Sequence, residues 1–154
     1  MRRILMVCMG NICRSPMADG IMRHKIKLHG LDALVDSAGT ISLHAGENPD
    51  PRATKCLLEK GIDIRRLIAR PFTKQDFTNF DFIFVMDNEN YRAIQSLADT
   101  AEEMQKVDFL MNLVNPGANT AVPDPYYGGN EGFENVYRML DEATDILIGK
   151  IKKS

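Results

Sequence analysis

One stretch near the start of the chain restricts its fold more than any other. The apolar run Ile4-Leu5-Met6-Val7 ends in Cys8, and after five further residues come Arg14, Ser15 and Pro16. The run predicts a strand, Ser15 is a good N-cap, and Pro16 suits the first position of a helix. The backbone N–H groups at such a helix N-terminus stabilise an anion in the preceding loop. We therefore expect a strand–loop–helix unit in which Cys8, as a thiolate, lies where an oxyanion docks.

Short apolar runs alternate with helical patterns along the rest of the chain. The predicted strands cover residues 3–7, 34–37 and 80–86, with a weaker candidate near 107–110, and the predicted helices cover about 16–28, 50–60 and 131–152. This alternation favours a parallel sheet with crossover helices. We predict an α/β fold, a single domain over residues 1–154 built as a three-layer sandwich with a central four-stranded parallel sheet and helices on both faces. Ligands of such sheets bind beyond the carboxyl ends of the strands, where Cys8 falls.

Composition and charge exclude several classes of function. The chain has 154 residues, 44% hydrophobic and 26% charged, which suits one globular domain. Its net charge of −2 gives no reason to expect a nucleic acid or a membrane as a partner, and no apolar segment is long enough to span a bilayer. Three cysteines do not form a disulfide framework and suit a reducing compartment, so we expect a cytoplasmic protein, and we expect it to be a monomer. The spacing of His24 and His29 favours surface residues over a metal site.

The residues around Cys8 match a known pattern. The sequence Val-Cys-Met-Gly-Asn-Ile-Cys-Arg-Ser-Pro at 7–16 resembles the signature of the low-molecular-weight protein tyrosine phosphatases. Four further stretches follow in that family's order, at 36–40, 48–52, 86–90 and 124–128. The resemblance covers nearly the whole chain. It implies an enzyme that needs no cofactor and hydrolyses phosphotyrosine monoesters through a phosphocysteine intermediate, with phosphotyrosine proteins and an opposing tyrosine kinase as partners.

Such a phosphatase needs a nucleophile, donors for the phosphoryl oxygens, and an acid for the leaving group. Cys8 is the candidate nucleophile. The N–H groups of the loop and the guanidinium of Arg14 supply the donors. Asp124 lies between Pro123 and Pro125, a sequence that by itself most often marks a turn. The family's general acid and base falls at the matching position, so the resemblance implies that role for Asp124.

The remaining candidate residues bind the substrate or support the loop. The expected substrate-binding residues are Met9, Gly10, Asn11, Ile12, Cys13, Ser15, Leu43, Tyr126 and Tyr127. Gly10 allows the loop to bend with its N–H inward, and Asn11 tolerates a positive φ. Ser15 can donate to the Cys8 sulfur, and the resemblance joins Ser37 to Asn11 behind the loop. The two tyrosines either pack against an aromatic phosphoester or lie beneath a loop, and the sequence alone leaves both open.

The chain departs from the family in two places. The family's hydrogen-bond network usually includes a histidine after the second helix, but Leu67 stands there, so the network is altered or another residue completes it. Leu43, followed by His44, stands where the family often has an aromatic residue on the pocket wall. Leucine supplies apolar area without ring stacking, which shifts the recognition of phosphotyrosine towards Tyr126.

Three other functions are compatible with parts of this pattern but fit the chain less well than a phosphotyrosine phosphatase. A thiol-dependent arsenate reductase passes a disulfide along further cysteines, and none follows Cys56. A protein arginine phosphatase tends to have threonine where this chain has Ile12, and isoleucine favours phosphotyrosine. A catalytically inactive phosphotyrosine-binding module is disfavoured because Cys8, Arg14 and Asp124 are all present.

Cys13 has two interpretations. On a loop that curls around an anion it could reach an oxidised Cys8 and form a reversible disulfide that prevents overoxidation. Otherwise Cys13 packs beneath the loop.

Overall fold

Four parallel strands form the centre of the computed structural model, which describes residues 1–153. They are β1 (Arg2–Cys8), β2 (Ala33–Gly39), β3 (Phe82–Val85) and β4 (Val107–Phe109). The order across the sheet is β2-β1-β3-β4, and all three pairings are parallel. All four predicted strands are confirmed. The third begins later than predicted because Phe80 caps the short helix before it.

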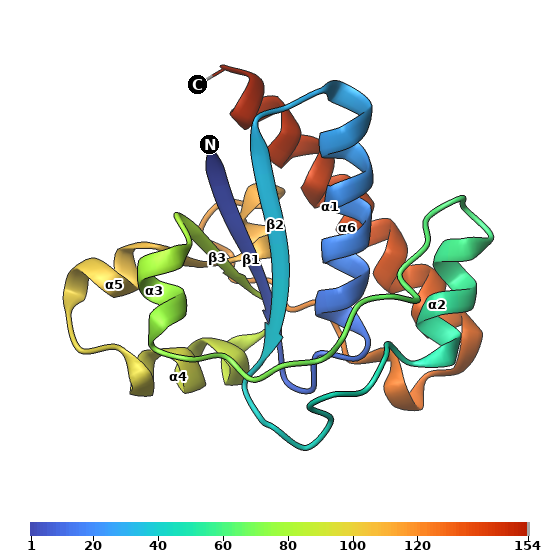
Figure 1. The fold of residues 1–154 in the computed structure, drawn as a ribbon, viewed down its shortest axis with the longest axis horizontal. Coiled ribbons are helices and arrows are strands. Elements are labelled where there is room, and N and C mark those ends of the chain that lie inside the picture. Colours follow the sequence, from blue (N-terminus) through green and yellow to red (C-terminus); the bar gives the residue numbers. More distant parts are fainter. Residues whose placement is uncertain (154) are drawn as a thin grey trace.

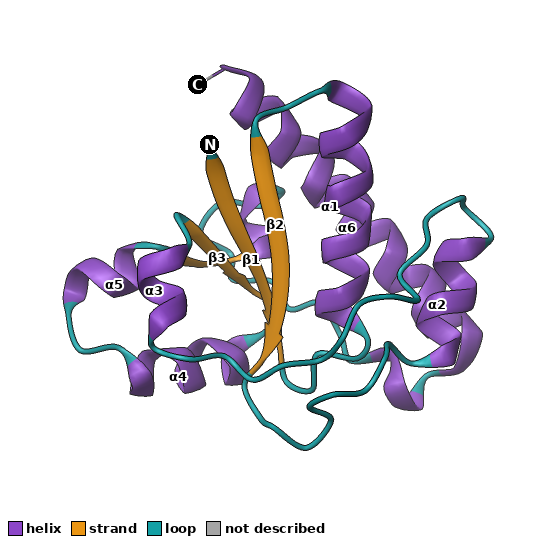
Figure 2. Cartoon of the chain, in the orientation of Figure 1, coloured by secondary structure: helices purple, strands orange, loops and turns teal. Residues whose placement is uncertain are grey.

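The helices cover both faces of this sheet (Figures 1 and 2). On one side lie α1 (Arg14–His29), α2 (Pro51–Leu58) and α6 (Gly129–Lys153), and on the other lie α3 (Gln75–Asn79), α4 (Asn88–Leu97) and α5 (Ala101–Gln105). Two short 3-10 turns, η1 (Leu110–Leu113) and η2 (Pro125–Tyr127), complete the chain. The predicted three-layer sandwich is confirmed. Over residues 1–153, no helix combines the length and apolarity needed to cross a membrane.

The core is divided by the sheet into two clusters, because side chains alternate between the faces of a strand. Along β1, Ile4 and Met6 belong to one cluster, while Leu5 and Val7 belong to the other. The first cluster packs against α1, α2 and α6, and the second packs against α3 and α4. Both faces of β1 are therefore buried, as expected for a central parallel strand.

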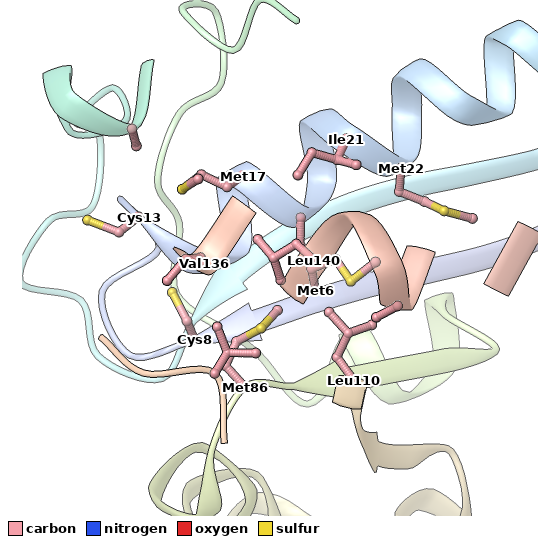
Figure 3. Close-up of a cluster of buried hydrophobic side chains, with 14 of the residues drawn as sticks. Met6, Cys8, Cys13, Met17, Ile21, Met22, Met86, Leu110, Val136 and Leu140 are labelled. Atoms are coloured by element: carbon pink, nitrogen blue, oxygen red, sulfur yellow. The ribbon is translucent and has the colours of Figure 1, made fainter. Parts of the chain in front are cut away.

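Cys8 lies at the carboxyl end of β1, at the edge of the first cluster (Figure 3). β1 has β2 on one side and β3 on the other, so the strand order reverses at this point. Ligand sites of open α/β sheets form where the order reverses. The topology therefore places Cys8 at the expected position of a site.

The start of α1 differs from the prediction. The helix begins at Arg14 with Cys13 in the N-cap position, and no side chain caps it. Ser15 is the second helical residue, and its hydroxyl bonds to other side chains instead. Pro16 remains tolerated, because the N–H that proline lacks has no partner within the first turn of a helix.

Candidate active site

The loop between β1 and α1 curls around the sulfur of Cys8. Cys8 is 3% exposed, and its Sγ lies 3.0 Å from the Ser15 hydroxyl oxygen. The backbone N–H of Asn11 donates to the same sulfur at 3.3 Å. Asn11 has φ 58°, which confirms the positive φ expected there. Gly10 is not in the left-handed region, so the sharp bend of the loop lies at Asn11 rather than at the glycine.

The side chain of Asn11 holds the loop to two neighbouring segments. Its Nδ2 donates to Ser15 Oγ at 2.7 Å and to Ser37 Oγ on β2 at 3.0 Å. Its Oδ1 accepts from the backbone N–H of Arg70 at 3.0 Å. The expected link between Asn11 and Ser37 is confirmed. The backbone N–H of Arg70 is thus the third partner of the Asn11 side chain.

The end of β2 passes directly beneath the loop. A Cβ atom on Gly39 would lie 2.8 Å from the Met9 carbonyl oxygen. Thr40 N–H donates to the Cys8 carbonyl and Ile41 N–H to the Met9 carbonyl, at 2.9 and 3.1 Å. Only glycine permits this close approach at position 39, which fixes the height of the loop above the sheet.

Arg14 is buried in the first turn of α1, and hydrogen bonds hold one side of its guanidinium group. Its Nη1 donates to Asp87 Oδ2 at 2.6 Å and to the Val122 carbonyl at 3.0 Å. Its Nη2 lies 3.9 Å from Asp124 Oδ2. Burial disfavours the charge on Arg14, but the Cys8 sulfur, Asp87 and Asp124 outweigh it, so the pKa of Arg14 lies above its ordinary value. The guanidinium is a fixed cation beside the sulfur.

Asp124 is brought to the site by the segment before α6. It caps the 3-10 turn η2, with its Oδ1 accepting from the Tyr126 N–H at 3.0 Å, and Pro125 takes the first position of the turn. The side chain of Asp124 is 36% exposed. Prolines on both sides restrict the backbone, which reduces the entropy lost in holding the carboxyl group. Its second oxygen faces Arg14.

These segments enclose a cavity of about 240 Å³. Its lining residues come from the loop, from the segment after β2 and from η2: Cys8, Met9, Gly10, Ile12, Cys13, Arg14, Ile41, Leu43, His44, Asp124, Tyr126 and Tyr127. Both tyrosines therefore face the cavity, and Tyr127 is 91% exposed at its rim. A larger hollow of about 660 Å³ beside α2 is shallow, and the residues around it include no cysteine or histidine.

Three predicted residues lie behind the cavity rather than in its wall. Asn11, Ser15 and Ser37 are buried and act on the loop through the hydrogen bonds described above. The other predicted site residues all line the cavity. Ile41 and Asp87 were missed by the sequence analysis. A signal for Asp87 existed, because it lies two residues after the end of β3, whose carboxyl end meets that of β1 at the same edge of the sheet.

The cysteines and histidines serve no metal site in the described part of the chain. All three cysteines are free and buried, and burial, together with Asp50, raises the pKa of Cys13 above its ordinary value. Within residues 1–153, no group of three or more His, Cys, Asp or Glu side chains is arranged to hold a metal ion. His24 and His29 are exposed. The disulfide between Cys8 and Cys13 stays a prediction.

Comparisons with known proteins agree with this geometry. A family model described as low molecular weight phosphotyrosine protein phosphatase matches residues 3–154. A relative of that name from Schizosaccharomyces pombe is 42% identical over 149 residues, 94% of each chain. A crystal structure of a protein tyrosine phosphatase from Entamoeba histolytica superimposes with a TM-score of 0.92 at 39% identity, over 99% of this chain and 98% of that one.

A Drosophila arginine phosphatase has a similar structure, with a TM-score of 0.90 at 33% identity over 100% of this chain and 99% of that one. Every one of these matches spans nearly the full length of both chains. The chain therefore belongs to the low molecular weight protein tyrosine phosphatase family.

Proposed function

We propose that this phosphatase hydrolyses phosphotyrosine monoesters in proteins through a phosphocysteine on Cys8. Arg14 and the loop amides bind the phosphoryl group, and Asp124 acts first as general acid and then as general base. One observation carries the proposal: Cys8 and Arg14, at the two ends of one loop, line the same cavity of about 240 Å³ as Asp124, which is far away in the sequence.

In the first step the Cys8 thiolate attacks phosphorus, and the bond from phosphorus to the tyrosyl oxygen breaks. Asp124 gives its proton to the departing phenolate oxygen. The Nη1 group of Arg14 donates its hydrogen bonds to Asp87 and Val122, so Nε and Nη2 are left to bind two phosphoryl oxygens. The loop N–H groups and the N-terminus of α1 stabilise the charge that develops on these oxygens.

In the second step water hydrolyses the phosphocysteine. The Asp124 carboxylate takes a proton from the attacking water, and the bond between phosphorus and sulfur breaks. The Ser15 hydroxyl, 3.0 Å from Sγ, donates a hydrogen bond to the departing thiolate. Asn11 Nδ2 donates to the same hydroxyl oxygen, which leaves the Ser15 proton free to point at sulfur.

The walls of the cavity favour an aromatic ring as the leaving group. Ile12, Ile41 and Leu43 supply apolar surface, and Tyr126 supplies a ring with which the phenyl group can stack. None of these side chains offers a charged partner to a guanidinium. These apolar and aromatic walls support phosphotyrosine rather than phosphoarginine as the substrate class.

Phosphoarginine is the second candidate, because a structure with a TM-score of 0.90 is named as an arginine phosphatase. Ile12 is the discriminating residue, since its side chain narrows the cavity without offering a polar contact. Ile12→Thr should raise the activity on phosphoarginine relative to phosphotyrosine. If the ratio of the two activities does not change, Leu43 or Tyr126 determines the substrate preference instead.

The test is turnover of phosphotyrosine, phosphoserine and phosphoarginine peptides by the purified protein. We expect activity on phosphotyrosine, and activity on phosphoarginine alone would overturn the substrate class. Cys8→Ser should abolish turnover while still binding inorganic phosphate. Asp124→Ala should lower kcat much more for aryl phosphates with basic leaving groups than for activated ones, because a good leaving group needs no proton.

The free, buried cysteines favour a reducing compartment, so we place the activity in the cytoplasm, opposite a tyrosine kinase. Cys8, Arg14 and Asp124 all come from one chain, and a monomer therefore suffices for the chemistry.

A further inference from the structure

Arg52, in the first turn of α2, connects the phosphate loop to the segment that holds Asp124. Asp50, the N-cap of α2, donates its backbone N–H to the Ile12 carbonyl at 2.8 Å. Its carboxylate binds the Arg52 guanidinium, and Arg52 Nη1 donates to the Tyr126 carbonyl at 2.8 Å. Asp50 and Arg52 thus bridge two segments that are far apart in the sequence.

The guanidinium of Arg52 is held from several directions. It binds the Asp50 carboxylate at two points, Nε to Oδ1 at 3.1 Å and Nη2 to Oδ2 at 3.0 Å. Its central carbon lies 5.1 Å from the ring centre of Tyr126 and 4.9 Å from that of Phe133 on α6. Planar, two-point contact of this kind fixes an arginine in a way that a lysine cannot reproduce.

Tyr126 passes this constraint to Asp124 through its two backbone polar groups. The N–H of Tyr126 donates to Asp124 Oδ1 at 3.0 Å, and its carbonyl accepts from Arg52 at 2.8 Å. A residue held at both its N–H and its carbonyl cannot rotate without breaking one of these bonds. The orientation of the Asp124 carboxyl group therefore depends on Arg52.

We propose that Arg52 is a positioning residue that aims the Asp124 carboxyl group at the leaving-group oxygen. The inference rests on the proposed role of Asp124 and adds a residue to it. Arg52 does not line the cavity of Cys8, so its removal should impair proton transfer while leaving phosphate binding intact.

The chain offers a matched control in Asp63-Ile64-Arg65. Arg65 binds Asp63 in the same way, from N to Oδ1 at 2.9 Å, from Nε to Oδ1 at 3.0 Å and from Nη2 to Oδ2 at 2.9 Å. Among residues 1–153, its guanidinium hydrogen-bonds to Asp63 alone. Arg52 therefore differs from Arg65 in its contacts with the Tyr126 carbonyl and with the rings of Tyr126 and Phe133.

The experiment compares Arg52→Met with Arg65→Met across aryl phosphates whose leaving groups differ in pKa. For Arg52→Met we expect kcat to fall about tenfold with the most basic leaving groups and less than about threefold with activated ones, with an unchanged inhibition constant for inorganic phosphate. Arg65→Met should match the parent throughout. An equal loss across the series, or phosphate inhibition weakened as much as kcat, would overturn the proposal.

Two further variants separate this proposal from the proposed function. If Asp124→Ala shows no dependence on the leaving group, the acid assignment itself fails. If Asp124→Ala shows it, adding Arg52→Met should cause little further loss, because Arg52 acts through Asp124. Additive losses would overturn the positioning role. Arg52→Lys keeps the charge and the alkyl stem that the fold needs. If Arg52→Lys folds and its kcat relative to the parent is the same for every leaving group, the positioning role is overturned as well.

Discussion

Asp19 lies inside α1, one turn beyond Ser15, and is fully buried. Its Oδ1 accepts from Arg23 at 2.8 and 3.2 Å, while its Oδ2 is the one buried side-chain oxygen or nitrogen in residues 1–153 without a hydrogen-bond partner. Burial raises the pKa of Asp19 to about 6, although the charge of Arg23 and the Ser37 hydroxyl oppose the shift and Asp36 adds to it. The carboxyl group adjoins the network that holds Asn11, through Ser37.

This shift predicts how the stability of the fold changes with pH. An unfolded aspartate titrates near pH 4, so between about pH 4 and pH 6 the folded state binds more protons at Asp19. Its contribution to the free energy of unfolding therefore falls as the pH rises through this window, by on the order of 2–3 kcal/mol. Asp19→Asn does not titrate, so its free energy of unfolding relative to the parent should rise between pH 4 and pH 7.

Urea unfolding of both proteins at several pH values measures this difference. A difference between variant and parent that stays constant with pH would show that Asp19 has the same pKa in both states. Asp99→Asn, at an exposed side chain, is the control for replacing an aspartate by asparagine.

At the scale of the elements, the start of α4 does two things at once. Asp87 caps the helix, with its Oδ1 accepting from the Asn90 N–H at 2.8 Å, and its Oδ2 accepts from Arg14 at 2.6 Å. The capping geometry of α4 therefore also orients the cation of the site. Asp87, two residues after the end of β3, therefore serves both the helix and the site.

Two substitutions separate the two roles of Asp87. Asp87→Ala should lower the free energy of unfolding by about 1 kcal/mol through loss of the cap, whereas asparagine is a good N-cap and should retain it. Both should lower kcat/KM for aryl phosphates by about tenfold, because a charged acceptor on Arg14 is lost. Denaturant unfolding and steady-state kinetics on the same preparations measure the two effects.

The cap of α5 is the control for this pair. Thr100 caps α5 and forms a capping box with Glu103, on the side of the sheet away from α1, α2 and α6. Thr100→Ala should reduce stability by a similar amount without changing kcat/KM. If Asp87→Asn keeps full activity, the charge of Asp87 does not matter for Arg14.

At the scale of the whole molecule, the site exists only when the sheet and both helical layers are assembled. Its residues come from the loop after β1, the segment after β2, the start of α4 and η2. Both core clusters include side chains of β1, β2 and β3, so we expect a single cooperative transition on unfolding. An anion that binds this site binds the folded state alone.

Inorganic phosphate should therefore stabilise the protein by mass action. At about 100 times its dissociation constant, phosphate should add about 2.7 kcal/mol to the free energy of unfolding. Cys8→Ser should retain this stabilisation and Arg14→Ala should lose most of it. The measurement is urea unfolding followed both by far-UV circular dichroism and by tyrosine fluorescence, since the chain has no tryptophan. Transitions that differ between the two probes would contradict the single cooperative unit.

The strand–loop–helix unit, the parallel sheet and the place of Cys8 and Arg14 could all be predicted from the sequence. These follow from local patterns, namely apolar runs of strand length and turn residues between them. The proximity of Asp124 to Arg14 was implied only by the resemblance to a family. The bond between Ser15 and Cys8 was expected and is confirmed, whereas the expected N-cap role of Ser15 was wrong. The sequence could not choose between them, because a serine hydroxyl suits both roles.

The contacts that hold the site together could not be predicted in this way, because they join distant segments through the backbone. The Arg70 amide on Asn11, the Val122 carbonyl on Arg14 and the Tyr126 carbonyl on Arg52 are backbone groups. Every residue carries a carbonyl, and every residue except proline carries an N–H, so no residue type marks which of them will meet a distant side chain. Long-range packing of the two layers on the sheet brings these groups into place.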